Sequence, residues 1–261
     1  MEADKWLFDQ CSITLRKPIF VVRTKMDLAI EGGNHDSGLT EDEVKTKVRE
    51  NIAQNLGLDK NIEIYLVSAW HPKNHDLPKL IDDIKKQLTG SKRDRFIADM
   101  AAWTTNAFKD KRTVAIKIIG VRAGLAAANG LNSIPGLNIA VDLGIMVEMS
   151  KQIIHIYGLT QEQMDFLQKY SNSPTFNASK AAIIRMAIGY TTAEGIAIFL
   201  KSIGAKVAVK YAAQWIPFIG QLISAVIGYK ITYGFGEKIL DESEHAAMHL
   251  SGMLITDGAP A

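Results

Sequence analysis

An alternation of helical and strand-like segments in the first hundred residues constrains the fold of this 261-residue chain more than any other feature. Two short apolar segments rich in β-branched residues, 19–23 and 62–67, are typical of buried strands. A polar, glycine-containing loop is expected at 31–38, and helical patterns are found at 3–15, 40–57 and 76–88. Strands alternating with helices of this length imply right-handed βαβ units in a parallel sheet. We therefore expect an α/β fold in this part of the chain.

Local signals place the ends of two of these helices. Thr40 and Glu43 match the capping-box pattern, and apolar residues at helical spacing follow as far as Gly57. Glycine is the commonest residue just after a helix, because it adopts left-handed backbone conformations without strain. Asp76 as a cap and Pro78 in the first turn are expected to open the next helix.

Two strands are too few for a buried parallel sheet, which normally has four or more. Only 18 residues precede the first predicted strand, which is too short for the missing βαβ units. We therefore expect the C-terminal half of a doubly wound parallel-sheet domain. An incomplete gene model, a fragment and a natural truncation would each produce such a sequence, and all three stay open.

Polar residues follow both predicted strands directly. Thr24, Lys25 and Asp27 come after the first strand, and Ser68 and Ala69 come after the second. Ligands of open α/β sheets bind beyond the carboxyl ends of the strands. The Asp27 carboxylate can accept from both N–H donors on the Watson–Crick edge of guanine, while the Lys25 stem lies along the base. A backbone N–H after the second strand can donate to the guanine carbonyl, with Ser68 supporting that loop.

Adenine would leave the Asp27 carboxylate facing an acceptor, so this arrangement selects guanine through the cost of an unpaired polar group. The alternative interpretation is that the lysine and the aspartate only form a turn at a strand end.

The sequence resembles the immunity-related GTPase family, which comprises interferon-inducible, dynamin-like GTPases of cell-autonomous immunity. The resemblance is close over about the first hundred residues and rests on five stretches in this order: KPIFVVRTKMD, SGLTEDEVKTKVRENIAQNL, IEIYLVSAW, DLPKLIDDIKKQL and SKRDRF. By this likeness Thr24, Lys25 and Asp27 form the base-specificity motif, with Thr in place of the commoner Asn. Ser68 and Ala69 match the last guanine-contacting motif.

The resemblance implies GTP or GDP as ligand, Mg²⁺ in complete family members, GTP hydrolysis, and assembly on intracellular or vacuolar membranes in innate defence. The sequence departs from the family in the residues that bind the phosphates. It has no G-x-x-x-x-G-K-[ST] motif, and no switch Thr or D-x-x-G can be placed ahead of residue 19. No catalytic residue and no Mg²⁺ ligand can be identified. Phosphate contacts supply most of the nucleotide affinity in such domains. We therefore expect the chain alone to recognise the base, to bind GTP weakly and not to hydrolyse it.

Charged side chains are concentrated in residues 1–112, and most of the chain beyond them is apolar. We expect residues 1–95 to form a partial GTPase domain, which contains the C-terminal, guanine-recognising half of a P-loop GTPase-type parallel sheet. Residues 96–261 are expected to form an all-α, apolar helical domain. Two uncharged runs, 123–141 and 211–229, contain the sequences Ile134-Pro135 and Ile216-Pro217. They are either membrane segments or buried helices of a bundle, and the Asn, Gln and Pro residues inside them favour a bundle. Peripheral membrane contact through an exposed apolar face stays open.

Composition bounds the compartment and the partners. A net charge of +2 is too small to indicate nucleic-acid binding, and the single Cys11 cannot form an internal disulfide. The N-terminus has no signal-peptide pattern. We therefore expect a cytoplasmic protein, and peripheral contact with intracellular membranes stays open.

Other titratable residues are interpreted conservatively. The pairs His71 and His75, and His245 and His249, are expected to be solvated, because a metal site needs more than two ligands. The basic clusters at 92–95 and 109–112 are expected at helix ends and turns, with phosphoinositide contact as the alternative.

Two classes of function follow. The first is an immunity-related GTPase, or a truncated paralogue of one, with guanine nucleotide and copies of itself or related GTPases as partners. The second is a non-catalytic helical protein that binds a membrane or a partner protein and retains a vestigial half of a GTPase domain.

Overall fold

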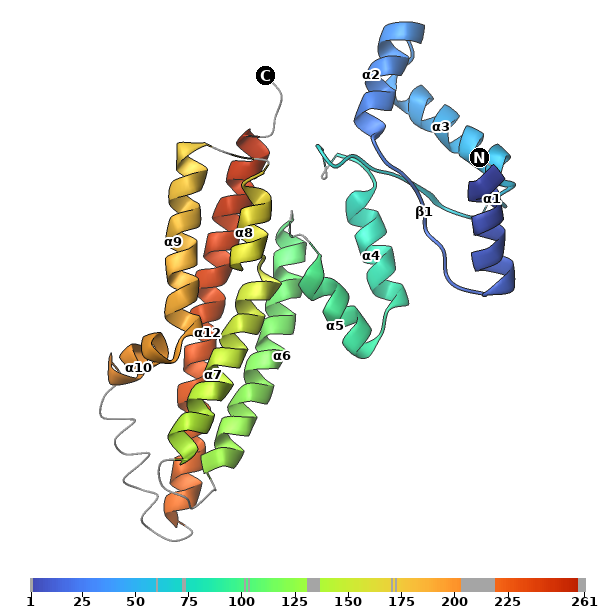
Figure 1. The fold of residues 1–261 in the computed structure, drawn as a ribbon. Helices are drawn as coiled ribbons and strands as arrows, with labels where there is room; N and C mark the ends of the chain where they lie inside the picture. Colours follow the sequence, from blue (N-terminus) through green and yellow to red (C-terminus); the bar gives the residue numbers. More distant parts are fainter. Residues whose placement is uncertain are drawn as a thin grey trace. The chain divides into compact units, whose positions relative to one another are not determined.

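A computed structural model describes residues 2–59, 61–71, 74–100, 102, 104–130, 137–169, 171, 173–202 and 219–257 (Figure 1). The chain divides into two compact units, Met1–Arg93 and Asp94–Ala261. An α/β unit followed by a helical one is the predicted order, and this part of the fold prediction is confirmed.

The first unit contains a sheet of two parallel strands, β1 (Val21–Arg23) and β2 (Ile64–Leu66). Val21 pairs with Ile64 and Arg23 pairs with Leu66. The parallel arrangement agrees with the predicted βαβ connection, whereas both strands are shorter than the segments 19–23 and 62–67.

Apolar residues cover the two faces of β2. Ile64 and Leu66 pack with Met26 and Val44 on one face, while Tyr65 and Val67 pack with Leu80 on the other. Every residue of β2 is buried, as expected for a strand of a parallel sheet with helices on both sides. The helices of this unit are α1 (Glu2–Asp9), a π-helix η1 (Gln10–Thr14), α2 (Met26–Ser37), α3 (Glu41–Leu56) and α4 (Leu77–Gln87).

The prediction of a loop at 31–38 is wrong, because these residues belong largely to the helix α2. Gly33 lies where α2 approaches α3: a Cβ added there would be 2.4 Å from Cγ2 of Val44. Gly38 ends α2 with φ at +61°, a conformation that favours glycine. Close packing and a helix end therefore explain two glycines that suggested a loop.

The caps predicted for α3 are present. The Thr40 side chain accepts from the Glu43 amide, the Glu43 carboxylate accepts from the Thr40 amide at 2.8 Å, and Gly57 ends the helix with φ at +65°. The first predicted helix, at 3–15, is present as α1 and η1, and its residues Trp6 and Leu7 are exposed.

The second unit is helical wherever its described residues adopt regular structure. Its helices are α5 (Gly90–Asp99), which begins before the unit boundary, α6 (Thr105–Gly130), α7 (Leu137–Ile156), α8 (Gln161–Leu167), α9 (Pro174–Thr191), α10 (Ala193–Ser202) and α12 (Ile219–Asp257). The long helices α6, α7 and α12 run side by side (Figure 1). Thr160 and Gln163 form a capping box at the start of α8, as their spacing predicts.

A close approach of helices organises the core of this unit. Ile119 of α6, Met149 of α7 and Phe235 of α12 are fully buried. A Cβ added to Gly236 would lie 2.8 Å from the Ile119 side chain and 3.1 Å from the Met149 sulfur. Gly236 therefore lets the three helices pack closely.

The described residues contain no single helix long and apolar enough to cross a membrane. One pair of helices, α9 with the part of α10 up to Leu200, passes the same length and composition test together and is bent by 77° at the break between them. The two Ile-Pro sequences, 134–135 and 216–217, lie outside the described residues. In run 123–141, Ala123 and Ala126 are fully buried in the helical unit.

Candidate functional site

The polar segments that follow β1 and β2 lie next to each other. The Val67 amide donates to the Arg23 carbonyl at 2.8 Å, and the Met26 amide donates to the Val67 carbonyl at 3.1 Å. These two bonds continue the strand pairing past the end of the sheet. They bring the segment that contains Thr24, Lys25 and Asp27 alongside the segment that starts at Ser68.

Lys25 has an unusual backbone conformation for a residue with a side chain. Its φ of 58° and ψ of 42° are left-handed, and it occupies the N-cap position of α2. A left-handed L-residue costs about 1–2 kcal/mol. Met26, the next residue, is fully buried in the core of this unit, and burying its side chain contributes about 1.5–3 kcal/mol, which offsets this cost. Thr24 and Lys25 are exposed.

Asp27 lies in the first turn of α2, where the helix dipole favours a negative charge. Its Oδ1 atom is buried, and no hydrogen-bond donor reaches it from the described residues. A buried acceptor without a donor costs about 1–3 kcal/mol, more for a charged group. A donor that reached this atom would remove that cost.

Ser68 supports the loop after β2. Its side chain is fully buried, and its Oγ accepts from the backbone amides of Trp70 and His71, each at 3.2 Å. These bonds turn the chain sharply and leave Ala69 and Trp70 exposed. The loop therefore presents its backbone at Ala69 beside the segment after β1.

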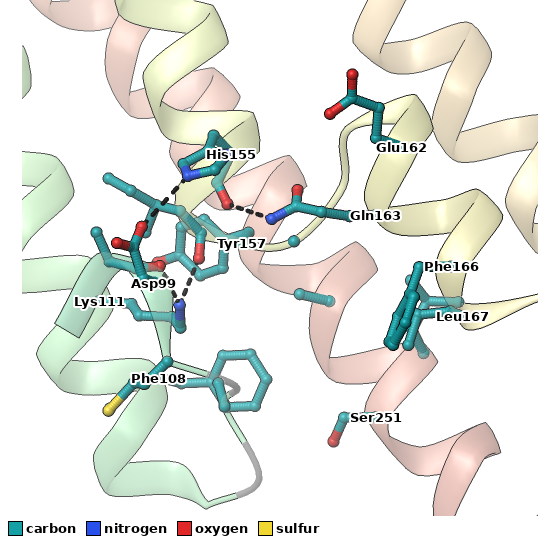
Figure 2. Close-up of a pocket in the computed structure, with 17 residues that line it drawn as sticks. Asp99, Phe108, Lys111, His155, Tyr157, Glu162, Gln163, Phe166, Leu167 and Ser251 are labelled. Atoms are coloured by element: carbon teal, nitrogen blue, oxygen red, sulfur yellow. Dashed lines mark hydrogen bonds and ion pairs between the residues drawn. The ribbon is translucent and has the colours of Figure 1, made fainter. Parts of the chain in front are cut away.

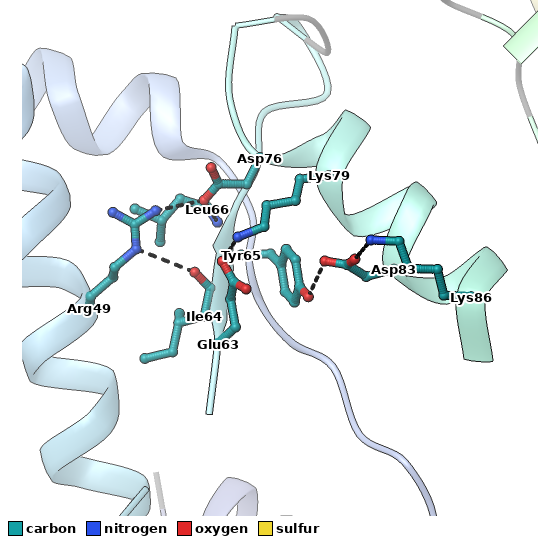
Figure 3. Close-up of polar contacts among 9 residues, drawn as sticks. All are labelled: Arg49, Glu63, Ile64, Tyr65, Leu66, Asp76, Lys79, Asp83 and Lys86. Atoms are coloured by element: carbon teal, nitrogen blue, oxygen red, sulfur yellow. Dashed lines mark hydrogen bonds and ion pairs between the residues drawn. The ribbon is translucent and has the colours of Figure 1, made fainter. Parts of the chain in front are cut away.

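The network in Figure 3 holds β2 in place from the side. Oδ2 of Asp76 accepts from the Leu66 amide at 2.9 Å and from Arg49 of α3 at 2.7 Å. Arg49 Nε also donates to the carbonyl of Ile64 at 3.4 Å. Asp76 occupies the N-cap position of α4, as predicted, but its side chain makes no capping bond. The donors that it serves instead come from β2 and α3.

Tyr65 fixes the opposite face of β2. Its hydroxyl donates to Asp83 of α4 at 2.9 Å, and burial together with this bond raises the pKa of Tyr65 to about 12. Lys79 pairs with Glu63 beside it (Figure 3). The strand that ends at the candidate site is therefore held by both neighbouring helices.

The histidine predictions hold in part. His245 and His249 are exposed, and among the described residues no group of three or more His, Cys, Asp or Glu side chains is placed to hold a metal ion. His71 is exposed, but His75 is half-buried, and burial lowers its pKa. Nδ1 of His75 is buried without a partner in the described part of the chain, so the prediction of a solvated side chain is wrong for His75.

Two basic residues near the start of α6 have roles that sequence reasoning missed. Lys111 is buried, and Arg112 pairs with Asp241 and Glu244 of α12. A signal for the burial of Lys111 is present in the sequence. Ala107, Phe108, Val114 and Ala115 lie three or four residues from it, so Lys111 is in the middle of the apolar stripe of its helix.

Comparison with known families identifies the chain. A model of the interferon-inducible GTPase family matches residues 9–182, which covers both the strand-end segments and part of the helical unit. No curated protein matches the chain significantly. The chain belongs to the interferon-inducible GTPase family.

Binding of GTP or GDP is a property of this family. The orphaned acceptor of Asp27 at the ends of two parallel strands fits the purine part of such a ligand, because guanine presents two adjacent N–H donors. Residues for Mg²⁺ are not apparent among those that the structure describes.

Proposed function

We propose that this chain provides the guanine-recognising half of an interferon-inducible GTPase. The residues that bind the base are Thr24, Lys25, Asp27, Ser68 and Ala69. This proposal interprets the first unit as the C-terminal half of a P-loop GTPase-type domain. Hydrolysis of GTP requires phosphate-binding residues that the sequence given does not contain.

The single observation that carries the proposal is the buried, unpaired Oδ1 of Asp27. Guanine N1–H and its exocyclic amine would both donate to this carboxylate, which turns an unfavourable buried acceptor into a charge-assisted pair. The exposed Lys25 stem is two residues from Asp27 in the sequence and can cover a face of the base. The Ala69 amide is on the exposed loop after β2, where it can donate to the guanine carbonyl.

The test compares GTP with xanthosine triphosphate, which carries a carbonyl where guanine carries the amine. Binding is measured by ligand-observed NMR, because we expect the 261-residue chain to bind GTP only in a high micromolar range or weaker. Asp27→Asn replaces an acceptor with a donor at that point, so the chain should lose detectable GTP binding, while binding of xanthosine triphosphate should become stronger.

The matched control is Asp59→Asn, an exposed aspartate in the same unit. It should leave the preference for GTP unchanged. Asp76 is not a suitable control, because its carboxylate holds β2. A GTP preference that survives Asp27→Asn would mean that Thr24–Asp27 is only a turn, and sub-micromolar GTP binding by the unaltered chain would show phosphate contacts outside this proposal.

We propose peripheral membrane contact by the helical unit as a second activity. The support is the bend of 77° between α9 and α10, with Ile188 and Ile198 exposed near it. Exposed apolar side chains on amphipathic helices insert at the headgroup boundary of a bilayer. This activity agrees with a cytoplasmic protein that associates with intracellular membranes, alone or in assemblies with further GTPases.

Cosedimentation with phosphatidylcholine–phosphatidylserine vesicles tests the membrane proposal. Ile198→Asp should reduce the bound fraction several-fold, since a carboxylate disfavours insertion. Ile13→Asp, at an equally exposed position in the first unit, should not change it. Equal binding by both variants, or no binding by the unaltered chain, contradicts the proposal.

A further inference from the structure

The helical unit contains a pocket of about 450 Å³ that is separate from the strand-end site (Figure 2). It lies among α5, α6, α7, α8 and α12. Apolar side chains, among them Phe108, Phe166 and Leu250, make up much of its wall. This size and lining are those of sites for small molecules, in which a few polar groups fix the orientation of the ligand.

Lys111 is the polar group that distinguishes this pocket. Its side chain is buried, with 3% of the residue exposed. Its Nζ donates to the carbonyl of Ala98 at 2.8 Å and to the carbonyl of Ile156. These carbonyls belong to the last turns of α5 and α7, where carbonyl groups have no partner within their own helix. The ammonium therefore supplies a hydrogen-bond donor at two helix C-termini.

The ammonium of Lys111 can donate more hydrogen bonds than these two. A charged lysine has three N–H donors, and two of them are engaged. Within the described ranges no carboxylate lies at ion-pair distance from it. Asp99, which also lines the pocket, pairs with Arg95 at 2.5 Å and with His155 at 3.3 Å.

Within the described residues, the charge of Lys111 is therefore compensated only in part, by the Asp99 carboxylate without a direct ion pair. Burial lowers the pKa of Lys111 to about 8, while the Asp99 carboxylate acts in the opposite direction and is outweighed. A buried charge without a counter-ion is unfavourable, and an anion that pairs with it relieves this cost. In Figure 2 Lys111 and Asp99 lie on one side of the pocket, and Phe166 and Leu167 lie on the other.

The remaining charges of the pocket limit the ligand to a single negative charge. Asp99 and Glu162 also line the pocket, so a dianion would be repelled. We propose that the pocket binds a small apolar monocarboxylate, whose carboxylate accepts from Lys111 and whose hydrocarbon tail packs against Phe108, Phe166 and Leu250. This site is independent of the guanine site.

Calorimetric titration of the 261-residue chain with octanoate and with 1-octanol tests the proposal. Both probes carry the same tail, and only octanoate carries the charge. We expect octanoate to bind at least tenfold more tightly, a difference of about 1.4 kcal/mol or more. Lys111→Met retains the length of the side chain and should abolish this difference, whereas Lys109→Met, at an exposed position on the same helix, should not.

A second pair of measurements separates binding in the pocket from binding elsewhere. Ala247→Phe fills the pocket from α12 and should prevent both probes from binding, with the melting curve as a check on folding. In the unaltered chain, octanoate labelled with ¹³C at the carboxyl should stay ionised to lower pH when bound. Equal affinity for the two probes, no binding of either, a preference that survives Lys111→Met, or an unchanged carboxyl titration would each overturn the proposal.

Discussion

At the scale of single residues, Lys111 shows how one buried amine connects stability to pH. The neutral form of a lysine side chain has two N–H donors, which match the two carbonyls that it contacts. The charged form retains these bonds but pays the cost of burial. The folded chain therefore releases this proton at a lower pH than the unfolded chain does, although Lys111 is still mostly charged at pH 7.

The sign of the resulting pH dependence follows from linkage. The pKa of Lys111 is about 8 in the folded chain and 10.5 without perturbation, so between these values the unfolded chain holds a proton that the folded chain has released. The free energy of unfolding should then rise with pH across this window, by up to about 3 kcal/mol from this residue. Below pH 8 the contribution is constant.

Denaturant unfolding of the unaltered chain and of Lys111→Met, from pH 7 to pH 10.5, measures this contribution as a difference between the two proteins. The difference should move in favour of the unaltered chain as pH rises, and Lys109→Met should show no such trend. Parallel stability profiles for the unaltered chain and Lys111→Met would mean that the lysine is not buried as a cation.

At the scale of secondary structure, α2 shows what a glycine pair contributes. Gly32 and Gly33 are neighbours in the same helix, but they differ in their surroundings. A Cβ on Gly33 would clash with Val44, whereas a Cβ on Gly32 meets no atom within 4 Å. Valine is stiff at its first side-chain torsion, so Val44 cannot easily move away.

We expect opposite effects from the same substitution at these two positions. Gly33→Ala should destabilise the first unit by about 1–3 kcal/mol, because it forces α2 away from α3. Gly32→Ala should stabilise it by about 0.5–1 kcal/mol, because alanine favours a helix. Thermal unfolding measures both, and similar effects of the two variants would contradict the observed packing of α2.

The elements that sequence reasoning predicted correctly are those set by local rules. The cap at Thr40 depends on contacts three residues apart, and the sequence displays it directly. The helix at 31–37 was missed because the partner of Gly33 is in the next helix. The role of Asp76 was missed for the same reason, since its donors are 10 and 27 residues away in the chain.

The same distinction holds for the candidate sites. The residues after the strands could be placed at one edge because parallel strands end together. The pocket around Lys111 could not be predicted, since Ala98 and Ile156 are 13 and 45 residues from the lysine. Only the packing of several helices brings these groups together.

At the scale of the whole molecule, the two-stranded sheet affects association. In the described part of the chain β1 pairs with β2 alone, and Val22 of β1 is exposed. An exposed edge strand offers backbone donors and acceptors to another chain. We propose that the chain forms dimers or larger assemblies through β1.

Light scattering over a range of concentrations tests this association. Val22→Lys should shift the chain towards monomer, because charged residues on an edge strand oppose pairing. Leu28→Lys, at an exposed apolar position on α2, should leave the assembly unchanged. A monomeric unaltered chain with a cooperative melt would show that the edge does not associate.

The close packing around Gly236 determines how slowly backbone amides of the helical unit exchange their protons for deuterium. Ile119, Met149 and Phe235 leave no space for solvent between α6, α7 and α12, so amides near them exchange only when the helices separate. The three-residue strand β1, with one neighbour in the described part of the chain, opens at far lower cost. The amides of β1 should therefore exchange in an early phase, and the amides in the middle of α12 should exchange last.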